Sequence, residues 1–148
     1  MQSTIKNIHR EISNHTNALL TCLNSEFESL NTHDYKALID IAVEKQSLVQ
    51  HLNELDQQRE LLSPVTSYID YLKQLDTPAL VDEWIQIQEK IKQCNLQNET
   101  NGRLITKLNL VTQETLGLFT GHQSNTDLTY SPGGLKNGTP PSITNTRV

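Results

Sequence analysis

The sequence predicts an all-α fold: a long antiparallel helical hairpin, a short connector helix and a long third helix packed along the hairpin in a three-helix, coiled-coil-like bundle. Residues 1–63 contain neither Gly nor Pro, and residues 79–116 contain only Gly102. Through both stretches apolar side chains recur every three or four residues, the period of an amphipathic helix. Because only 35% of the residues are hydrophobic and 5% aromatic, a thin, elongated assembly is favoured over a compact globule.

Length and charge exclude several classes of protein. The 148 residues fit one domain, and the net charge of −5 comes without a basic cluster, which excludes nucleic-acid binding. No run approaches 18 apolar residues and the N-terminus has no apolar signal core, so we expect a cytoplasmic protein without membrane insertion. Cys22 and Cys94 have no metal-like spacing and are expected to be small buried side chains.

The first helix is expected over about 3–30, where a stripe of apolar residues has helical spacing. The turn at 31–34 follows, with Thr32 or Asp34 as the next N-cap. A turn this short predicts an antiparallel hairpin. The stripe consists of Ile5, Ile8, Ile12, Leu19, Leu23, Phe27 and Leu30.

The second helix is expected over 34–62, because its apolar residues alternate in steps of four and three, the pattern of a coiled-coil seam. Lys45 and Arg59 occupy two seam positions. We expect both to bury their aliphatic stems and hold their charges at the rim, or Lys45 to pair with a glutamate. The seam consists of Leu38, Ile41, Lys45, Leu48, Leu52, Leu55, Arg59 and Leu62.

The connector helix is expected over 64–74 and the third helix over 78–119, each opened by Ser-Pro or Thr-Pro. Asn98 and Asn101 lie on the seam of the third helix, where an interhelical hydrogen bond is favoured over a binding role. A bundle over 1–120 is followed by a tail, 121–148, with four of the six glycines and three of the five prolines. This tail cannot offset its ordering entropy alone.

The end of the third helix carries apolar residues on more than one face. They exceed what packing on one face would use, so we expect a partner surface there, with ordinary core or a second copy as alternatives. The residues concerned are Leu104, Ile105, Leu108, Leu110, Val111, Leu116, Leu118 and Phe119.

No catalytic constellation, metal site or cofactor motif appears in the sequence. The five histidines are expected to be solvent-facing or hydrogen-bonded. The pairs Glu26/Glu28 and Asp82/Glu83 are expected to be solvated surface charge. An enzyme or metal protein built on a helical bundle is therefore the least favoured class.

Three segments together resemble the FlgN-type flagellar export chaperones, and they span about 34–134. The second helix resembles the family's N-terminal hairpin, the segment 94–105 its Asn-rich third helix, and the segment 129–134 its short tail motif. The matching residues are Asp34, Leu38, Glu44-Lys45-Gln46, Leu48, Leu52, Leu55 and Arg59, then Cys94-Asn95-Leu96-Gln97-Asn98-Glu99-Thr100-Asn101-Gly102-Arg103-Leu104-Ile105, then Thr129-Tyr130-Ser131-Pro132-Gly133-Gly134.

The resemblance implies a non-enzymatic cytoplasmic chaperone. Such a chaperone binds hook-associated proteins of the FlgK and FlgL type through their terminal helices, prevents their premature association and delivers them to the flagellar export gate. It implies export-gate docking by Tyr130 and substrate binding by Leu104, Ile105, Leu108, Val111, Leu116, Leu118 and Phe119. A homodimeric structural or signalling bundle without an export role is the alternative.

Overall fold

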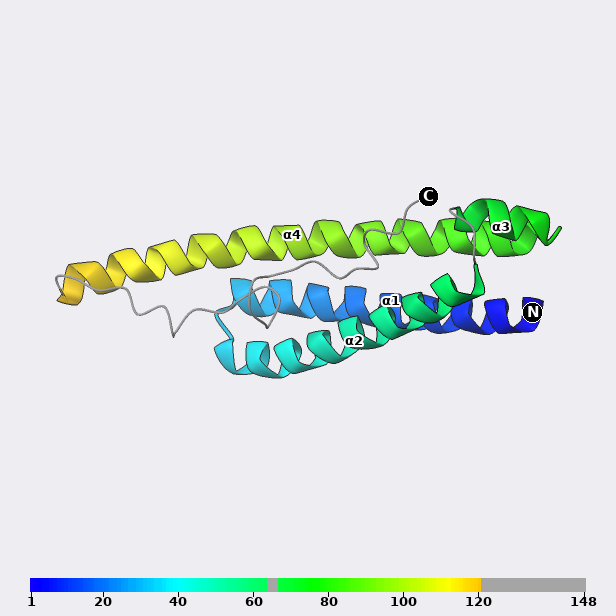
Figure 1. The fold of residues 1–148 in the computed structure, drawn as a ribbon. Helices are drawn as coiled ribbons and strands as arrows, with labels where there is room; N and C mark the ends of the chain where they lie inside the picture. Colours follow the sequence, from blue (N-terminus) through cyan, green and yellow to red (C-terminus); the bar gives the residue numbers. More distant parts are fainter. Residues whose placement is uncertain (64–66, 121–148) are drawn as a thin grey trace.

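The computed structural model describes residues 1–63 and 67–120, and for 110–116 and 118–120 it describes the backbone alone. It contains four helices: α1 (Gln2–Asn31), α2 (Tyr35–Leu62), α3 (Tyr68–Gln74) and α4 (Pro78–Thr120) (Figure 1). The all-α fold is thus confirmed. The predicted start of the connector at Pro64 and the whole tail, 121–148, lie outside the described residues.

Local capping sets where α2 and α3 begin. His33 adopts a left-handed backbone with φ of 56°, and the Asp34 side chain then accepts a hydrogen bond of 3.1 Å from the backbone N–H of Ala37. Asp34 is therefore the N-cap of α2, one of the two candidates that the sequence offers. Ser67 caps α3 by accepting from the backbone N–H of Asp70.

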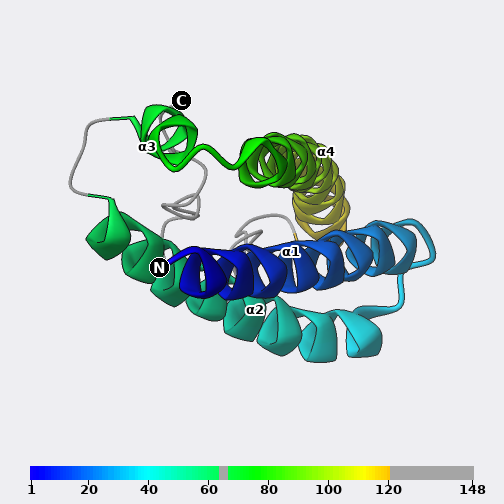
Figure 2. The same cartoon turned by 90° about the vertical axis from the view of Figure 1, so that its right-hand side faces the viewer.

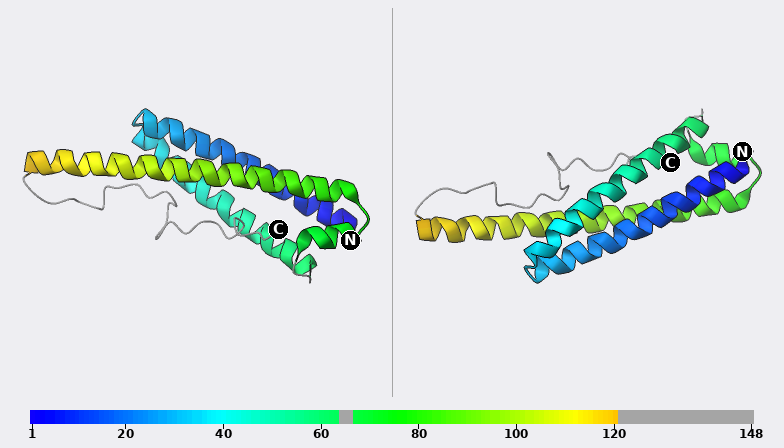
Figure 3. Two further views of the ribbon diagram at one scale, coloured as in Figure 1. Left: turned by 90° about the horizontal axis from the view of Figure 1, so that it is seen from above. Right: turned by 90° about the horizontal axis from the view of Figure 1, so that it is seen from below.

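Helix α1 is the centre of the bundle, because it packs against both α2 and α4, while α3 packs against α4. α2 runs antiparallel to α1, whereas α4 runs in the same direction as α1 (Figures 1 and 3). Seen end-on, α2 and α4 lie on different sides of α1 (Figure 2). Hydrogen-bonded partners on α1 and α4 are separated by 73 to 78 residues along the whole contact, so the two helices stay in one parallel register.

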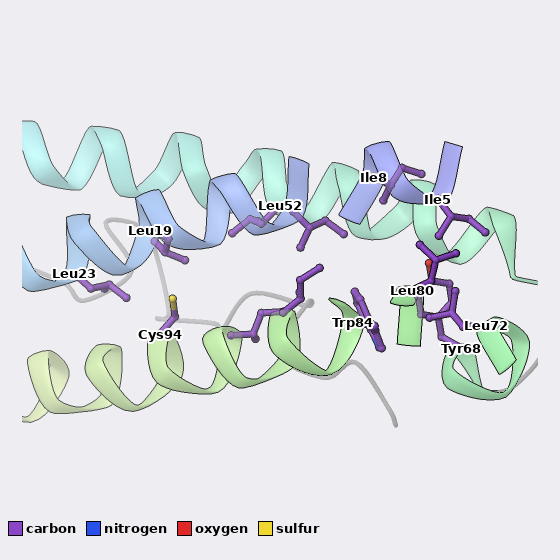
Figure 4. Close-up of a cluster of buried hydrophobic side chains, with 13 residues drawn as sticks. Ile5, Ile8, Leu19, Leu23, Leu52, Tyr68, Leu72, Leu80, Trp84 and Cys94 are labelled. Carbon is purple, nitrogen blue, oxygen red and sulfur yellow. The ribbon is translucent and has the colours of Figure 1, made fainter. Parts of the chain in front are cut away.

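A long apolar core fills the space between α1 and the other three helices (Figure 4). The predicted stripe on α1 is buried except for Phe27, which is half-buried. From the other helices the core receives Leu52, Tyr68, Leu72, Leu80, Trp84, Ile87, Ile91 and Cys94. A second, smaller cluster of Leu30, Leu38 and Ile105 closes the hairpin end of the bundle.

An aromatic cluster joins all four helices at the N-terminal end of α1. The Arg59 guanidinium lies 4.7 Å from the ring centroid of Tyr68 and 5.0 Å from that of Trp84. Its Nε donates to Asp56 Oδ1 at 2.8 Å. The prediction that Arg59 holds its charge at the rim is therefore wrong: two aromatic faces and a carboxylate stabilise the cation inside the protein.

His9 completes this cluster as a neutral ring. Its Nδ1 lies 3.3 Å from Glu83 Oε2, its Nε2 lies 2.9 Å from the Tyr68 hydroxyl, and the ring stacks on Trp84. A carboxylate only accepts, so Nδ1–H donates to Glu83 and the Tyr68 hydroxyl donates to Nε2. Burial lowers the pKa of His9 and the nearby Arg59 adds to this, against the opposing effect of Glu83.

The lowered pKa of His9 predicts an acid-sensitive bundle. The unfolded chain binds the proton more readily than the folded chain, so the contribution of His9 is fully present above pH 6.5 and declines below it. We expect the free energy of unfolding, measured by urea denaturation between pH 7 and 5, to fall by at most about 1.4 kcal/mol per pH unit from this group.

The matched variants are His9→Gln, which removes the titrating group, and His51→Gln, which alters an exposed histidine. His9→Gln should flatten the pH dependence between pH 7 and 5, whereas His51→Gln should leave it unchanged. Equal pH profiles for the wild type and His9→Gln would contradict this account.

Candidate functional site

Helix α4 projects beyond the hairpin. It has 43 residues against 30 in α1, and all views show its C-terminal end extending past the turn that joins α1 to α2 (Figures 1 and 3). In the parallel register Asn31 is level with about residue 106, so α4 continues for about 14 residues, or about 20 Å, past the end of α1. Of this segment, Leu108 at its base still packs against the hairpin. We call residues 107–120 the overhang.

The residues predicted to bind substrate form two groups, one that packs against the hairpin and one that lies farther along the overhang. Ile105 is 2% exposed and packs on Leu30 and Leu38 of the hairpin, and Leu104 and Leu108 are partly buried against the same cluster. These three side chains therefore already contact the chain's own core. Val111, Leu116, Leu118 and Phe119 lie on the overhang with side chains outside the described residues, as does all of Tyr130. Their roles stay predictions.

A buried ion pair lies one to two turns before the overhang. Glu26 of α1 is 0% exposed, and its Oε1 and Oε2 accept from the Lys45 Nζ of α2 at 3.2 and 3.3 Å. The prediction that Glu26 is solvated is thus wrong. Of the two expectations for Lys45, pairing with a glutamate is confirmed and a charge held at the rim is wrong. Each charge is tolerated inside the protein because the other accompanies it.

Asn101 of α4 joins this pair to the third helix. Its Nδ2 donates to Glu26 Oε1 at 2.8 Å and to the backbone carbonyl of Leu23 at 2.9 Å, and its Oδ1 accepts from Gln97 at 2.9 Å. The predicted interhelical hydrogen bond is confirmed for Asn101. It is wrong for Asn98, whose Oδ1 is buried and receives no donor from the described residues.

Sequence reasoning overlooked an exposed apolar row on α2. Tyr35, Ile39 and Val43 are 60%, 67% and 68% exposed, although each is large and apolar. They are spaced by four residues, so they share one face of the helix. The four-residue spacing was visible in the sequence. The longer apolar pattern of the seam, however, indicated only the buried face of α2, and the row lies on the opposite face.

The described residues contain little else that points to reaction chemistry. Cys22 and Cys94 are free and buried, as predicted. Among residues 1–63 and 67–120, no three His, Cys, Asp or Glu side chains gather as metal ligands would. In the same ranges, no helix is both long and apolar enough to span a bilayer.

These features define an elongated all-α bundle in which the last helix, α4, extends beyond the end of the hairpin against which it packs. The chain belongs to the FlgN family: the family model described as FlgN protein matches residues 1–138, which confirms the resemblance seen in the sequence. This is a family of flagellar export chaperones, not of enzymes. No curated protein and no solved structure matches the chain significantly.

The buried Glu26–Lys45 pair predicts how two substitutions change the free energy of unfolding. Glu26→Gln keeps an acceptor for Asn101 but leaves the Lys45 ammonium buried without its counter-charge, and we expect a loss of about 3 kcal/mol in the free energy of unfolding. Adding Lys45→Met removes the second charge, and most of that loss should be recovered. Urea denaturation at pH 7 measures both variants.

Glu28→Gln is the matched control, since Glu28 is exposed on the same helix. It should change the free energy of unfolding by no more than about 0.5 kcal/mol. A double variant as unstable as Glu26→Gln alone would show that the cost does not come from an isolated buried charge.

Proposed function

We propose that this chain is a cytoplasmic chaperone for hook–filament junction proteins of the FlgK and FlgL type. It binds their terminal helices, prevents their premature association and delivers them to the flagellar export gate. The overhang supports this proposal most strongly. A helix that continues about four turns past its own bundle offers a surface on which another helix can pack.

The substrate helix would take the place that the hairpin leaves empty beside the overhang. That helix would adjoin the hairpin end of the bundle, where Leu30, Leu38 and Ile105 close the core. The overhang itself contributes Val111, Leu116, Leu118 and Phe119 from its sequence. A terminal helix with an apolar face would extend the three-helix packing along α4, and reversible release follows because no closed core has to be opened.

Delivery needs a second contact that leaves the overhang occupied. The tail motif around Tyr130 follows the overhang directly in the sequence, so a tyrosine there can reach the export gate while the substrate stays bound. We propose export-gate docking as its role on the strength of the family's tail motif.

Charge introduced into the overhang tests the proposal. Val111→Asp and Leu118→Asp, each made in the full chain, should weaken binding of a fluorescent peptide with the C-terminal helix sequence of a hook-associated protein at least tenfold, because burying a carboxylate there opposes packing. Fluorescence anisotropy measures the affinity. Ile85→Asp is the control, since Ile85 is an exposed apolar residue of α4 far from the overhang.

The proposal fails if the overhang variants bind the peptide as well as Ile85→Asp does while circular dichroism shows all three folded. Substitution of Leu104, Ile105 or Leu108 would be a weaker test, because these residues also hold the hairpin end of the bundle together.

The apolar row on α2 favours a second candidate, a homodimeric bundle without an export role. Tyr35, Ile39 and Val43 could pack against the same row of a second copy. Light scattering separates the two candidates. A stable dimer that Ile39→Glu dissociates, together with no affinity for the junction-protein peptide, would favour the homodimer.

A further inference from the structure

A groove lined mainly by polar and charged residues lies between α1 and α4, well away from the overhang. Its volume is about 390 Å³, within the usual range of ligand pockets. Lys6, Arg10 and Ser13 line it from α1, and Glu83, Ile87 and Lys90 from α4. Lys90 lies 17 residues before the overhang, about 25 Å along the helix axis.

The groove opens on the flank of α1 that faces away from α2. Cys22 marks the α2 side, since its thiol contacts the backbone of Ile41. At about 100° per residue, Lys6 lies about 160° around α1 from Cys22, and Arg10 about 120°. A helix lying in this groove would therefore contact α1 and α4 without displacing α2.

Three cations line the groove in a chain whose net charge is −5. Lys6 and Arg10 are exposed. Arg10 has an exposed ion pair with Glu11 at 3.6 Å, and Lys6 has no ion-pair partner among the described residues. Lys90 reaches across the groove and donates to Asn17 of α1. The carboxylate of the lining, Glu83, accepts a hydrogen bond from the neutral His9 ring and keeps its charge, so the lining carries three cations against one anion. Local charge therefore favours an anionic occupant.

The cations are spaced along the groove like the turns of a helix. Lys6 and Arg10 are four residues apart, about 6 Å along the axis, and Lys90 reaches Asn17, about two turns beyond Arg10. A helix with a carboxylate at every fourth residue presents negative charges at the same interval. The buried side chain of Ile87 supplies an apolar floor for the stem of such a helix.

We propose that the α1–α4 groove docks an acidic α-helix of a partner protein, with carboxylates one turn apart contacting Lys6, Arg10 and Lys90. This site goes beyond the proposed function, because it is separate from the overhang. It would let the chaperone hold a substrate and a second protein together.

The test uses the full chain and a designed probe. The probe is a fluorescein-labelled, alanine-based 18-residue helical peptide with glutamate at every fourth position, and its twin carries glutamine instead. We expect the acidic peptide to bind at least tenfold more tightly than its twin in fluorescence anisotropy at 50 mM salt. Raising the salt to 200 mM should weaken binding, since the contacts are exposed charges.

The groove variant Lys6→Glu should weaken binding of the acidic peptide at least fivefold. Lys36→Glu is the matched control, an exposed lysine on α2 outside the groove, and should change the affinity less than twofold. The groove variant should still bind the junction-protein peptide normally, which separates this proposal from the proposed function.

Three results would overturn the proposal. The first is equal affinity for the acidic peptide and its twin. The second is equal weakening by the groove variant and by Lys36→Glu, which would show a general charge effect. The third is loss of acidic-peptide binding by the Val111→Asp variant, which would show that the peptide binds the overhang. Circular dichroism confirms that each variant is folded before binding is measured.

Discussion

The parallel alignment of α4 on α1 is the constraint on which the rest of the structure depends. A shift of α4 by one turn would separate Asn101 from Glu26 and would leave the buried Glu26–Lys45 pair without its third member. Apolar side chains alone would tolerate such a shift better, because leucine and isoleucine pack in several registers. The polar network thus fixes the register and, with it, the length of helix that extends past the hairpin.

The two ends of the bundle differ in composition. At the N-terminal end of α1, Trp84, Tyr68, His9 and Arg59 satisfy one another in a closed cluster that involves all four helices. At the hairpin end, the small cluster around Ile105 closes the core, and α4 continues without the hairpin beside it. One end therefore ties all four helices together, whereas at the other end only α4 extends beyond the hairpin.

Local sequence predicted the helices and most of the core, because residues such as Ile5, Ile12 and Leu23 form a stripe within a single helix. It also named Asp34 as one of two candidate N-caps of α2. It did not predict that Glu26 turns inward while Phe27 is half-buried, because the reason lies on another helix, in Lys45. The cluster around Arg59 was missed for the same reason. The predicted substrate site rests on the surplus of apolar residues in α4 and on the family resemblance, and it stays a prediction. The charge pattern of the α1–α4 groove could not be read from the sequence, because it depends on the register of the two helices.

The reactivity of the two cysteine thiols depends on whether the helices stay packed together. The Cys22 thiol faces α2, where it donates to the carbonyl of Ile41, and the Cys94 thiol faces α1, where it donates to the carbonyl of Thr16. Burial raises the pKa of each to about 11, so neither is an appreciable thiolate at neutral pH while the helices stay packed. Alkylation of Cys22 thus records opening of the hairpin, and alkylation of Cys94 records departure of α4, without any added label.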